Sequence, residues 1–251
     1  MRFNDKVIIV TGGGQGIGRA FANAFAREGA KIVIAEINET KARVVAEEIT
    51  SVGFYATAIK TDVTDEENVN QMVKESIEKY GRIDVLINNA GILSTIEMKP
   101  FWEISTEEWD KILSVNLKGM FLCCKAVVPI MQKQSKGKII NLSSSTVLEG
   151  RPNYIHYVSS KAGVIGLTRA MAREVGDWNI NVNVITPGAT DTGIPRVSVS
   201  PEQEKEMITK RCIKRKQIPQ DLVGTVMFLA SDESDFISGQ IINVDGGLSM
   251  Y

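Results

Sequence analysis

A tyrosine and a lysine stand four positions apart in the segment HYVSSKAG, at Tyr157 and Lys161. On a helix, positions i and i+4 share one face, so the phenol and the ammonium group can lie side by side. A free tyrosine has a pKa of about 10, and a cation held within ~4–6 Å lowers that pKa by favouring the phenolate. The pair can therefore move a proton to or from an alcohol or carbonyl oxygen. Taken alone, the same spacing is more common in pairs on the surface of a helix.

A glycine-rich turn, TGGGQGIG at Thr11–Gly18, follows the apolar run KVIIV. Its glycines are spaced as Gly12, Gly16 and Gly18. A strand, a tight turn and the start of a helix together form an anion site, because backbone N–H groups and the helix dipole point at the same place. This context favours the binding of a dinucleotide pyrophosphate over the alternative of a simple turn.

An acidic residue, Glu36, ends the second apolar run, about 20 residues beyond the glycines. A carboxylate at this position can accept hydrogen bonds from the ribose of NAD and would repel the extra phosphate of NADP. Neither Gly14 nor Gln15 in the glycine turn is basic. The expected cofactor is therefore NAD. Asp62 has two interpretations that both remain open: a hydrogen bond to adenine, or a helix cap at the start of DVTDEE.

Short apolar runs alternate with amphipathic segments along the whole chain. Strands are expected at 6–10, 31–35, 55–60, 84–88, 138–142, 180–185 and 240–244. Helices are expected at 16–28, 39–52, 65–80, 105–133, 157–175 and 219–230, with Val44, Val45 and Ile49 facing inward in the second of them. This alternation predicts an α/β protein with a single-domain Rossmann fold, a doubly wound parallel sheet of about seven strands with helices on both faces. Ligands of such sheets bind beyond the carboxyl ends of the strands.

The composition is ordinary for a globular enzyme, with 251 residues, 43% of them hydrophobic, and a formal net charge of −1. One domain spanning 1–251 is expected, because no linker divides the chain. The small net charge gives no field that would attract nucleic acid or an anionic membrane. The apolar runs are too short to span a bilayer, and no signal-peptide pattern precedes the first of them. The cysteines Cys123, Cys124 and Cys212 are too few for a disulfide framework, so a reduced, cytoplasmic protein is expected, and no metal site.

Together, these residues resemble the short-chain dehydrogenase/reductase family over essentially the whole chain. The resemblance rests on six segments in order: TGGGQGIG, NNAG at Asn88–Gly91, VNLKG around Asn116, IINLSSS followed by YVSSK, PGATDT, and FISGQIINVDGG. It implies an oxidoreductase in which a bound nicotinamide cofactor carries the hydride and the protein supplies position and proton transfer.

The resemblance implies a catalytic set of Asn116, Ser144, Tyr157 and Lys161. Tyr157 is the expected acid/base, and Ser144 would hydrogen-bond the substrate oxygen. Lys161 would also bind the nicotinamide ribose, while Asn116 would hold a water that links Lys161 to solvent. Ser144 is chosen among three consecutive serines because it lies 13 residues before Tyr157, the usual spacing in the family. Alternation along a strand also turns Ser143 and Ser145 the other way.

The same resemblance implies a set of cofactor-binding residues along the carboxyl edge of the sheet. Thr192 is expected at the nicotinamide carboxamide with Thr190 as the neighbouring candidate, and Asn88 could instead serve only hydrogen bonding at a strand end. The set is Gly12, Gln15, Gly16, Ile17, Gly18, Glu36, Asp62, Val63, Asn88, Ala90, Gly91, Tyr157, Lys161, Pro187, Gly188, Thr190 and Thr192.

The expected reaction is the NAD(H)-dependent interconversion of a small or medium, largely apolar secondary alcohol and its ketone. An apolar pocket is expected from Ile92, Leu93, Val147, Leu148, Tyr154, Ile194 and Met207. Residues 189–218 are long enough to form a substrate lid. The lone histidine, His156, is expected to have a structural or pocket-rim role because Tyr157 already fills the role of the base. Family members usually form tetramers through two long helices, here 105–133 and 157–175.

Two other functions remain open from the sequence. The segment KRCIKRK at 210–216 carries five basic residues, which would either form a solvated charged face or dock a phosphorylated carrier. The latter would make the protein a 3-oxoacyl-(acyl carrier protein or CoA) reductase; such enzymes normally use NADPH, and Glu36 weighs against this version. A dinucleotide-sensing regulator without catalysis would be expected to lack Tyr157 or Lys161.

Overall fold

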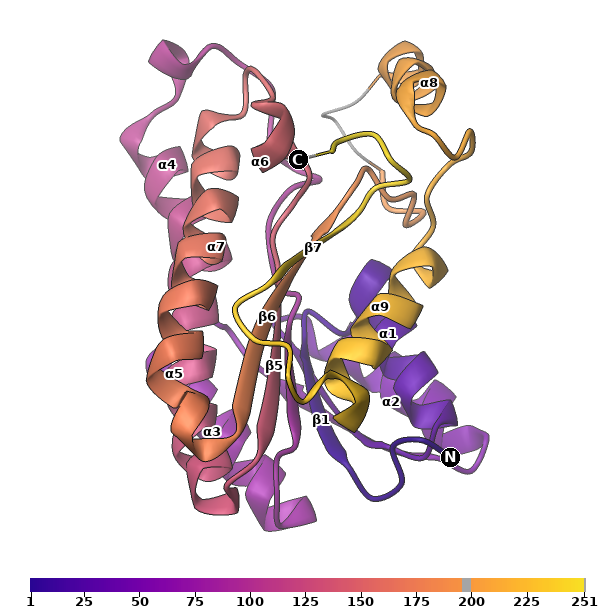
Figure 1. Cartoon of the computed structure of the whole chain (residues 1–251), viewed down its shortest axis with the longest axis vertical. Helices are drawn as coiled ribbons and strands as arrows, with labels where there is room; N and C mark the ends of the chain where they lie inside the picture. Colours follow the sequence, from indigo (N-terminus) through magenta and orange to yellow (C-terminus); the bar gives the residue numbers. More distant parts are fainter. Residues whose placement is uncertain (196–199, 251) are drawn as a thin grey trace.

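Seven strands form one fully parallel sheet in the order β3-β2-β1-β4-β5-β6-β7, as seen in a computed structural model that describes residues 1–195 and 200–250 (Figure 1). The strands are β1 (Val7–Thr11), β2 (Lys31–Glu36), β3 (Tyr55–Lys60), β4 (Val85–Asn88), β5 (Gly137–Leu142), β6 (Ile180–Pro187) and β7 (Ile241–Val244). Successive strands are added toward one side of the sheet from β1 to β3 and toward the other side from β4 to β7, so the loops after β1 and β4 mark the expected ligand site. The Rossmann-type α/β fold is confirmed.

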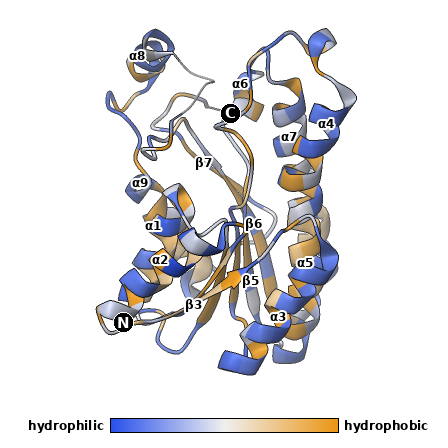
Figure 2. Ribbon diagram, turned by 180° about the vertical axis from the view of Figure 1, so that it is seen from behind, coloured by the Kyte–Doolittle hydropathy of each residue, from blue (hydrophilic) through white to orange (hydrophobic). Residues whose placement is uncertain are grey.

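Helices cover both faces of the sheet (Figure 1). One layer contains α1 (Gly16–Arg27), α2 (Glu39–Ser51) and α9 (Gln220–Ala230), and the other contains α3 (Glu66–Tyr80), α5 (Gly119–Gln134) and α7 (Ile155–Val175). Successive residues of β1 face opposite layers, so Ile8 and Val10 pack into one core while Val7 and Ile9 pack into the other. Figure 2 shows the apolar strands enclosed between helices whose outer sides are hydrophilic.

The long helical region after β4 is divided into three pieces. These are α4 (Thr106–Leu113), a π-helical turn at Ser114–Lys118, and α5. By length and composition Thr106–Gln134 could cross a membrane, but 44% of its most apolar window is buried within the fold. A core helix of a globular protein passes the same test, and in this chain the helix packs on the sheet.

Several short elements complete the described chain. They are α6 (Thr146–Glu149), α8 (Pro201–Lys210), and the 3-10 turns at Phe101–Glu103, Gly176–Trp178 and Asp232–Ser234. Helix α8 lies within the segment 189–218 that is expected to form a lid, and α6 is not among the expected helices. Part of the expected lid, residues 196–199, lies outside the described residues.

One inward-facing position in α2 is wrong. Val44 is 47% exposed, whereas Ala42, Val45 and Ile49 are buried. These three residues follow the i, i+3, i+7 spacing of one helical face. Val44 directly precedes Val45 and therefore points about 100° away from it around the helix axis. The β-branched side chain at 44 is therefore on the solvent side despite being apolar.

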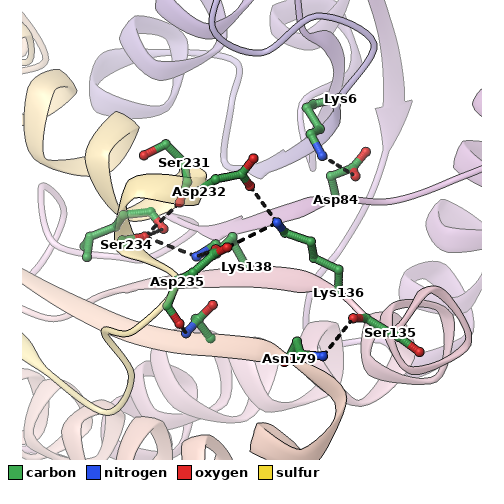
Figure 3. A network of polar contacts seen from close by, with 12 residues as sticks. Lys6, Asp84, Ser135, Lys136, Lys138, Asn179, Ser231, Asp232, Ser234 and Asp235 are labelled. Carbon is green, nitrogen blue, oxygen red and sulfur yellow. Dashed lines mark hydrogen bonds and ion pairs between the residues drawn. The ribbon is translucent and has the colours of Figure 1, made fainter.

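A polar network stabilises the end of the sheet at which the strands begin, away from their carboxyl ends (Figure 3). Lys138 on β5 lies 2.7 Å from Asp235 Oδ1 and donates to Ser234 Oγ at 3.2 Å. The neighbouring Lys136 lies 2.8 Å from Asp232 Oδ1. These contacts attach the turn after α9 to β5. Burial lowers the pKa of Lys138, and its ion pair with Asp235 only partly opposes that effect.

Candidate active site

A cleft of about 460 Å³ lies at the carboxyl ends of the strands and gathers residues from the loops that follow β1 to β6. Most of the residues expected to bind cofactor or substrate line it together. Those in the cleft wall are Gly12, Gln15, Gly16, Ile17, Glu36, Asp62, Val63, Ala90, Gly91, Ser144, Tyr157, Lys161, Pro187, Gly188, Thr190 and Thr192. The fold thus brings residues from Gly12 to Met207 into one cavity.

The glycine turn after β1 has the geometry that a pyrophosphate needs. Gly12 and Gly16 adopt φ values of 62° and 55°, which are unfavourable for residues with a side chain. A Cβ on Gly18 would collide with the carbonyl oxygen of Gly12, so only glycine lets α1 approach the turn this closely. Helix α1 begins at Gly16, and its N-cap residue Gln15 makes no side-chain cap. The first N–H groups of α1 are therefore available to an anion.

An asparagine that the sequence analysis does not single out braces this turn. Asn89 Nδ2 donates to Thr11 O at 2.9 Å and to Gly12 O at 3.0 Å. In return, Thr11 Oγ1 accepts from the backbone N–H of Asn89 and of Ala90, both at 3.0 Å. These bonds tie the end of β1 to the loop after β4, across the switch point of the sheet.

Glu36 holds a fixed carboxylate at one end of the cleft. Its Oε2 accepts from Gly14 N and its Oε1 from Asn38 N, both at 3.2 Å, and the residue is only 8% exposed. Each carboxylate oxygen can accept more than one hydrogen bond, so these contacts orient the group while leaving lone pairs for ribose hydroxyls. Lys41 stands close by and donates to Gln15 Oε1 at 2.6 Å.

Asp62 does not cap a helix. Its Oδ1 accepts from Thr64 N at 2.9 Å and from Thr64 Oγ1 at 2.7 Å. The N-cap of α3 is Asp65, which accepts from the backbone N–H of Glu67 and Asn68. Since Asp62 lines the cleft, the adenine interpretation is the one that remains, and it stays a prediction.

Tyr157 and Lys161 project from successive turns of α7 into the same part of the cleft. They are 5% and 4% exposed, and Lys161 Nζ lies 5.9 Å from the centre of the Tyr157 ring. The ammonium donates to Leu142 O, at the end of β5, at 2.8 Å. Burial lowers the pKa of Lys161 to about 8, because a charged amine is poorly stabilised away from water.

The three consecutive serines have different partners. Ser143 Oγ donates to Lys161 O at 2.7 Å, and Ser145 Oγ donates to Glu149 Oε1 at 2.9 Å. Ser144 Oγ accepts from Thr146 N at 3.3 Å and from Thr146 Oγ1 at 3.0 Å. An oxygen that accepts from Thr146 has its own hydrogen available to donate, which suits Ser144 for binding a substrate oxygen.

Asn116 is buried between α7 and the loop after β4 and is not part of the cleft wall. It sits in the π-helical turn, where its Oδ1 accepts from Ile92 N at 2.8 Å and its Nδ2 donates to Ile92 O at 3.2 Å and to Ser160 Oγ at 3.3 Å. A Cβ on Gly91 would lie 3.2 Å from Asn116 Oδ1 and 3.5 Å from Lys161 Nζ. Asn116 and Lys161 therefore flank the same small space at Gly91.

Asn88 and Gly18 are also outside the cleft wall. Asn88 is buried, and its Nδ2 donates to Asn141 Oδ1 at 2.9 Å and to Cys124 Sγ at 3.2 Å. The side chain faces the α5 layer because alternate residues of β4 point to opposite sides. The structure thus shows the strand-end hydrogen bonding of Asn88, and its contact with the cofactor stays a prediction.

The far end of the cleft combines apolar and charged side chains. The expected residues Ile92, Leu93, Tyr154, Ile194 and Met207 line it, but Val147 and Leu148 do not. The cleft also takes in residues that the sequence analysis does not predict, namely Ser94, Thr146, Glu149 and Arg151. The expected apolar pocket is therefore lined by polar and charged side chains as well.

The basic segment 210–216 is largely occupied with partners of its own chain. Arg211 is 2% exposed and donates to Ala189 O and Arg215 O. Lys216 lies 2.8 Å from Glu204, and Arg215 lies 2.6 Å from Asp221 and holds the pKa of that carboxyl at about 2. Ion pairs with acids of the same chain thus offset part of the charge of this segment.

His156 and the cysteines stand apart from the cleft wall. His156 is 1% exposed, and burial lowers its pKa. Cys123 and Cys124 are buried, which raises the pKa of both thiols and makes them unreactive, while Cys212 is exposed rather than part of a core. In the described part of the chain, no group of three or more His, Cys, Asp or Glu residues has metal-site geometry.

Known proteins resemble this chain over nearly its full length. A family profile described as enoyl-(acyl carrier protein) reductase matches residues 12–249. A 3-oxoacyl-[acyl-carrier-protein] reductase of Thermotoga maritima is 39% identical over 99% of both chains, and an uncharacterized oxidoreductase of the same organism is 40% identical over 98% of both. A crystal structure from Sinorhizobium meliloti 1021, described provisionally as a short-chain alcohol dehydrogenase, superimposes with a TM-score of 0.93 at 33% identity and covers 100% of both chains.

Proposed function

The chain belongs to the short-chain dehydrogenase/reductase family of oxidoreductases, and on that premise we propose that it interconverts a secondary alcohol and its ketone with NAD(H). One observation carries the proposal: a single cleft holds a carboxylate, Glu36, at one end and the group Ser144, Tyr157 and Lys161 at the other. The first can select a ribose with free hydroxyls, and the second can hold and protonate a carbonyl oxygen.

The cleft fits a nicotinamide dinucleotide along its whole length. The open N–H groups of α1 suit the pyrophosphate, and the conformations of Gly12 and Gly16 keep side chains out of its way. Glu36 would accept from the adenosine ribose, and Thr192 would hold the nicotinamide carboxamide. When bound, such a cofactor supplies or accepts the hydride.

The residues of this chain manage the proton and the orientation of the substrate. Tyr157 donates its phenolic proton to the carbonyl oxygen during reduction and takes it back during oxidation. Lys161 makes the phenolate accessible by placing a positive charge beside it. Ser144 donates a hydrogen bond to the same oxygen. Asn116, which flanks the same space at Gly91 as Lys161, would hold a water that links Lys161 to solvent.

The proposal also covers the lid and the assembly. Ile194 and Met207 reach the cleft from segment 189–218, which supports its role as a cover over the substrate. A homotetramer would use α5 and α7, and Phe121 on the outer side of α5 is 46% exposed in the single chain. Burial of such a side chain between subunits would be favourable.

A second substrate class is favoured by the curated relatives, several of which are named 3-oxoacyl-[acyl-carrier-protein] reductases. Reduction of a 3-oxoacyl thioester is itself a ketone reduction, so the same catalytic residues would serve it. Two features speak against this class here. Glu36 disfavours the NADPH that such enzymes normally use, and the basic segment 210–216 is paired with acids of its own chain.

Steady-state turnover of the purified protein tests the proposal. Simple ketones and secondary alcohols, oxo acids and 3-oxoacyl thioesters of coenzyme A and acyl carrier protein would each be assayed with NAD(H) and NADP(H). We expect turnover of non-thioester ketones with NADH as the better reductant. Turnover of thioesters alone would move the assignment to the second class. Binding of NADH without turnover of any compound would favour a dinucleotide sensor instead.

A further inference from the structure

The substrate end of the cleft contains a cation whose role the catalytic scheme leaves open. Arg151 follows α6 and Gly150, and its backbone N–H donates to Thr146 O at 3.4 Å. The residue lines the cleft. Among the residues that the structure describes, its guanidinium makes no hydrogen bond or ion pair, although every N–H group of a guanidinium is a donor.

The guanidinium is nevertheless held in place by an aromatic ring. Its Cζ lies 5.1 Å from the centre of the Tyr154 ring, within the range of a cation–π contact. Tyr154 is 2% exposed, and its ring packs against that of Tyr157 at 6.2 Å between centres with an interplanar angle of 65°. Arg151 is thus linked to the catalytic phenol through one buried ring, and stacking limits the orientations that its planar fork can adopt.

Glu149, the acidic residue closest to Arg151 in the sequence, has a different hydrogen-bond partner. Glu149 Oε1 accepts from Ser145 Oγ at 2.9 Å. The pKa of Lys210 is raised first by its hydrogen bond with Glu206 and, to a smaller extent, by the charge of Glu149. Arg151 therefore has an open fork in a partly enclosed site, while its acidic neighbour is hydrogen-bonded to Ser145.

We propose that Arg151 is a specificity residue that binds a carboxylate of the substrate. The inference rests on the proposed function and narrows it: the substrate is an oxo acid or hydroxy acid whose carboxylate stands a few carbons from the reacting carbon. Carboxylates are the partners that match a guanidinium fork in two parallel hydrogen bonds. The apolar side chains of Ile92 and Leu93 would pack on the carbons between the two polar ends.

Pairs of substrates that differ in the charge of one group but little in shape test whether Arg151 recognises a carboxylate. The pairs are 4-oxopentanoate and 5-oxohexanoate, each with its methyl ester, assayed with NADH. We expect the wild-type protein to show a KM for the better acid lower by about tenfold or more than for its ester, with similar kcat, because a charge-assisted hydrogen bond is lost in the ester. Arg151→Met should remove this preference, and Arg151→Lys should retain part of it.

Further variants keep the result interpretable. Arg27→Met, at an exposed position on α1, should leave both values unchanged. Glu149→Gln should lower the KM of the acid further, since it removes a like charge from the cleft. Fluorescence titration with NADH should give the same dissociation constant for Arg151→Met as for wild type, which would show that the variant is folded.

Calorimetric binding of the acids to the protein–NADH complex distinguishes failure of this inference from failure of the proposed function. If no ketone is turned over but the acid binds and Arg151→Met abolishes that binding, the proposed function fails and the carboxylate site stands. If ketones are turned over but acid and ester are equivalent, or if Arg151→Met weakens only coenzyme A thioesters, the carboxylate site is wrong and the proposed function stands.

Discussion

Lys161 Nζ lies 5.9 Å from the centre of the Tyr157 ring and donates to Leu142 O at 2.8 Å. Two elements create this relationship: the i, i+4 spacing of α7 sets both groups on one face, and the end of β5 supplies the carbonyl that fixes the ammonium. The charge is therefore held beside the phenol by contacts within the fold itself. Such preorganisation is what an acid/base pair needs, because no reorganisation is then required when the proton moves.

Replacing Lys161 with methionine should abolish turnover and stabilise the protein. The pKa of Lys161 is about 8 in the folded chain, below its ordinary value of 10.5. The folded chain thus binds fewer protons than the unfolded chain between pH 8 and 10.5, so the penalty of the buried charge is full below pH 8 and declines as the pH rises through that window. Below pH 8, this penalty corresponds to about 3 kcal/mol.

Urea unfolding of wild type and Lys161→Met at pH 7 and pH 10 measures this effect. We expect the variant to be more stable at pH 7, with the difference shrinking at pH 10. A variant that is less stable than wild type at pH 7 would mean that the bond to Leu142 O outweighs the burial of the charge.

Removing the carboxylate of Glu36 should relax cofactor selection. In the Glu36→Ala variant, the catalytic efficiency with NADP(H) should rise relative to NAD(H) by about tenfold or more, because a negative group no longer opposes the 2′-phosphate. Glu36→Asp, which keeps the charge, is the matched control. The ratio of kcat/KM values for the two cofactors is the measurement, and an unchanged ratio in the alanine variant would show that Glu36 does not set the cofactor preference.

Breaking the network at the amino edge of the sheet should affect stability and leave catalysis intact (Figure 3). Asp235→Ala leaves the buried ammonium of Lys138 without its 2.7 Å partner. The expected loss of stability is about 2 kcal/mol, since Asp235 is half-exposed and the full effect of a buried pair is larger. Lys138→Met should change the stability little, because it removes the buried charge and with it the need for an ion-pair partner. Denaturant midpoints and kcat of both variants test this, and equal destabilisation by the two substitutions would contradict it.

Much of the fold is readable from the sequence because strands and helices of this type have strong periodic patterns. Runs such as VIIV are buried on both faces and stand out in the sequence. The expected and observed ends of α2 and α3 agree within about two residues, because the capping residues Asn38 and Asp65 stand where these helices begin. Helix α6 is too short to show any period. The π-helical turn at Ser114–Lys118 keeps helical composition, so sequence periodicity cannot distinguish it from the α-helix around it.

The residues of the site likewise include some that the sequence predicts and some that it does not. The conformation of the glycine turn and the proximity of Tyr157 and Lys161 depend on local spacing, which the sequence displays directly. Asn88 is different, because the layer that a strand-end side chain faces depends on strand alternation, and it turns to Cys124 instead of the cleft. Arg151 is not predicted because nothing in GRPNY marks its side chain as lining a cavity; only the packing of Tyr154 against Tyr157 places it there.

The most direct test of proton transfer by Tyr157 is single-turnover kinetics of Tyr157→Phe. This substitution removes one hydroxyl and keeps the ring that packs against Tyr154. With a ketone that wild type reduces, we expect NADH to bind with an unchanged dissociation constant while the rate of NADH oxidation falls by about 100-fold or more. A Tyr157→Phe variant that binds NADH and oxidises it at close to the wild-type rate would show that another group delivers the proton.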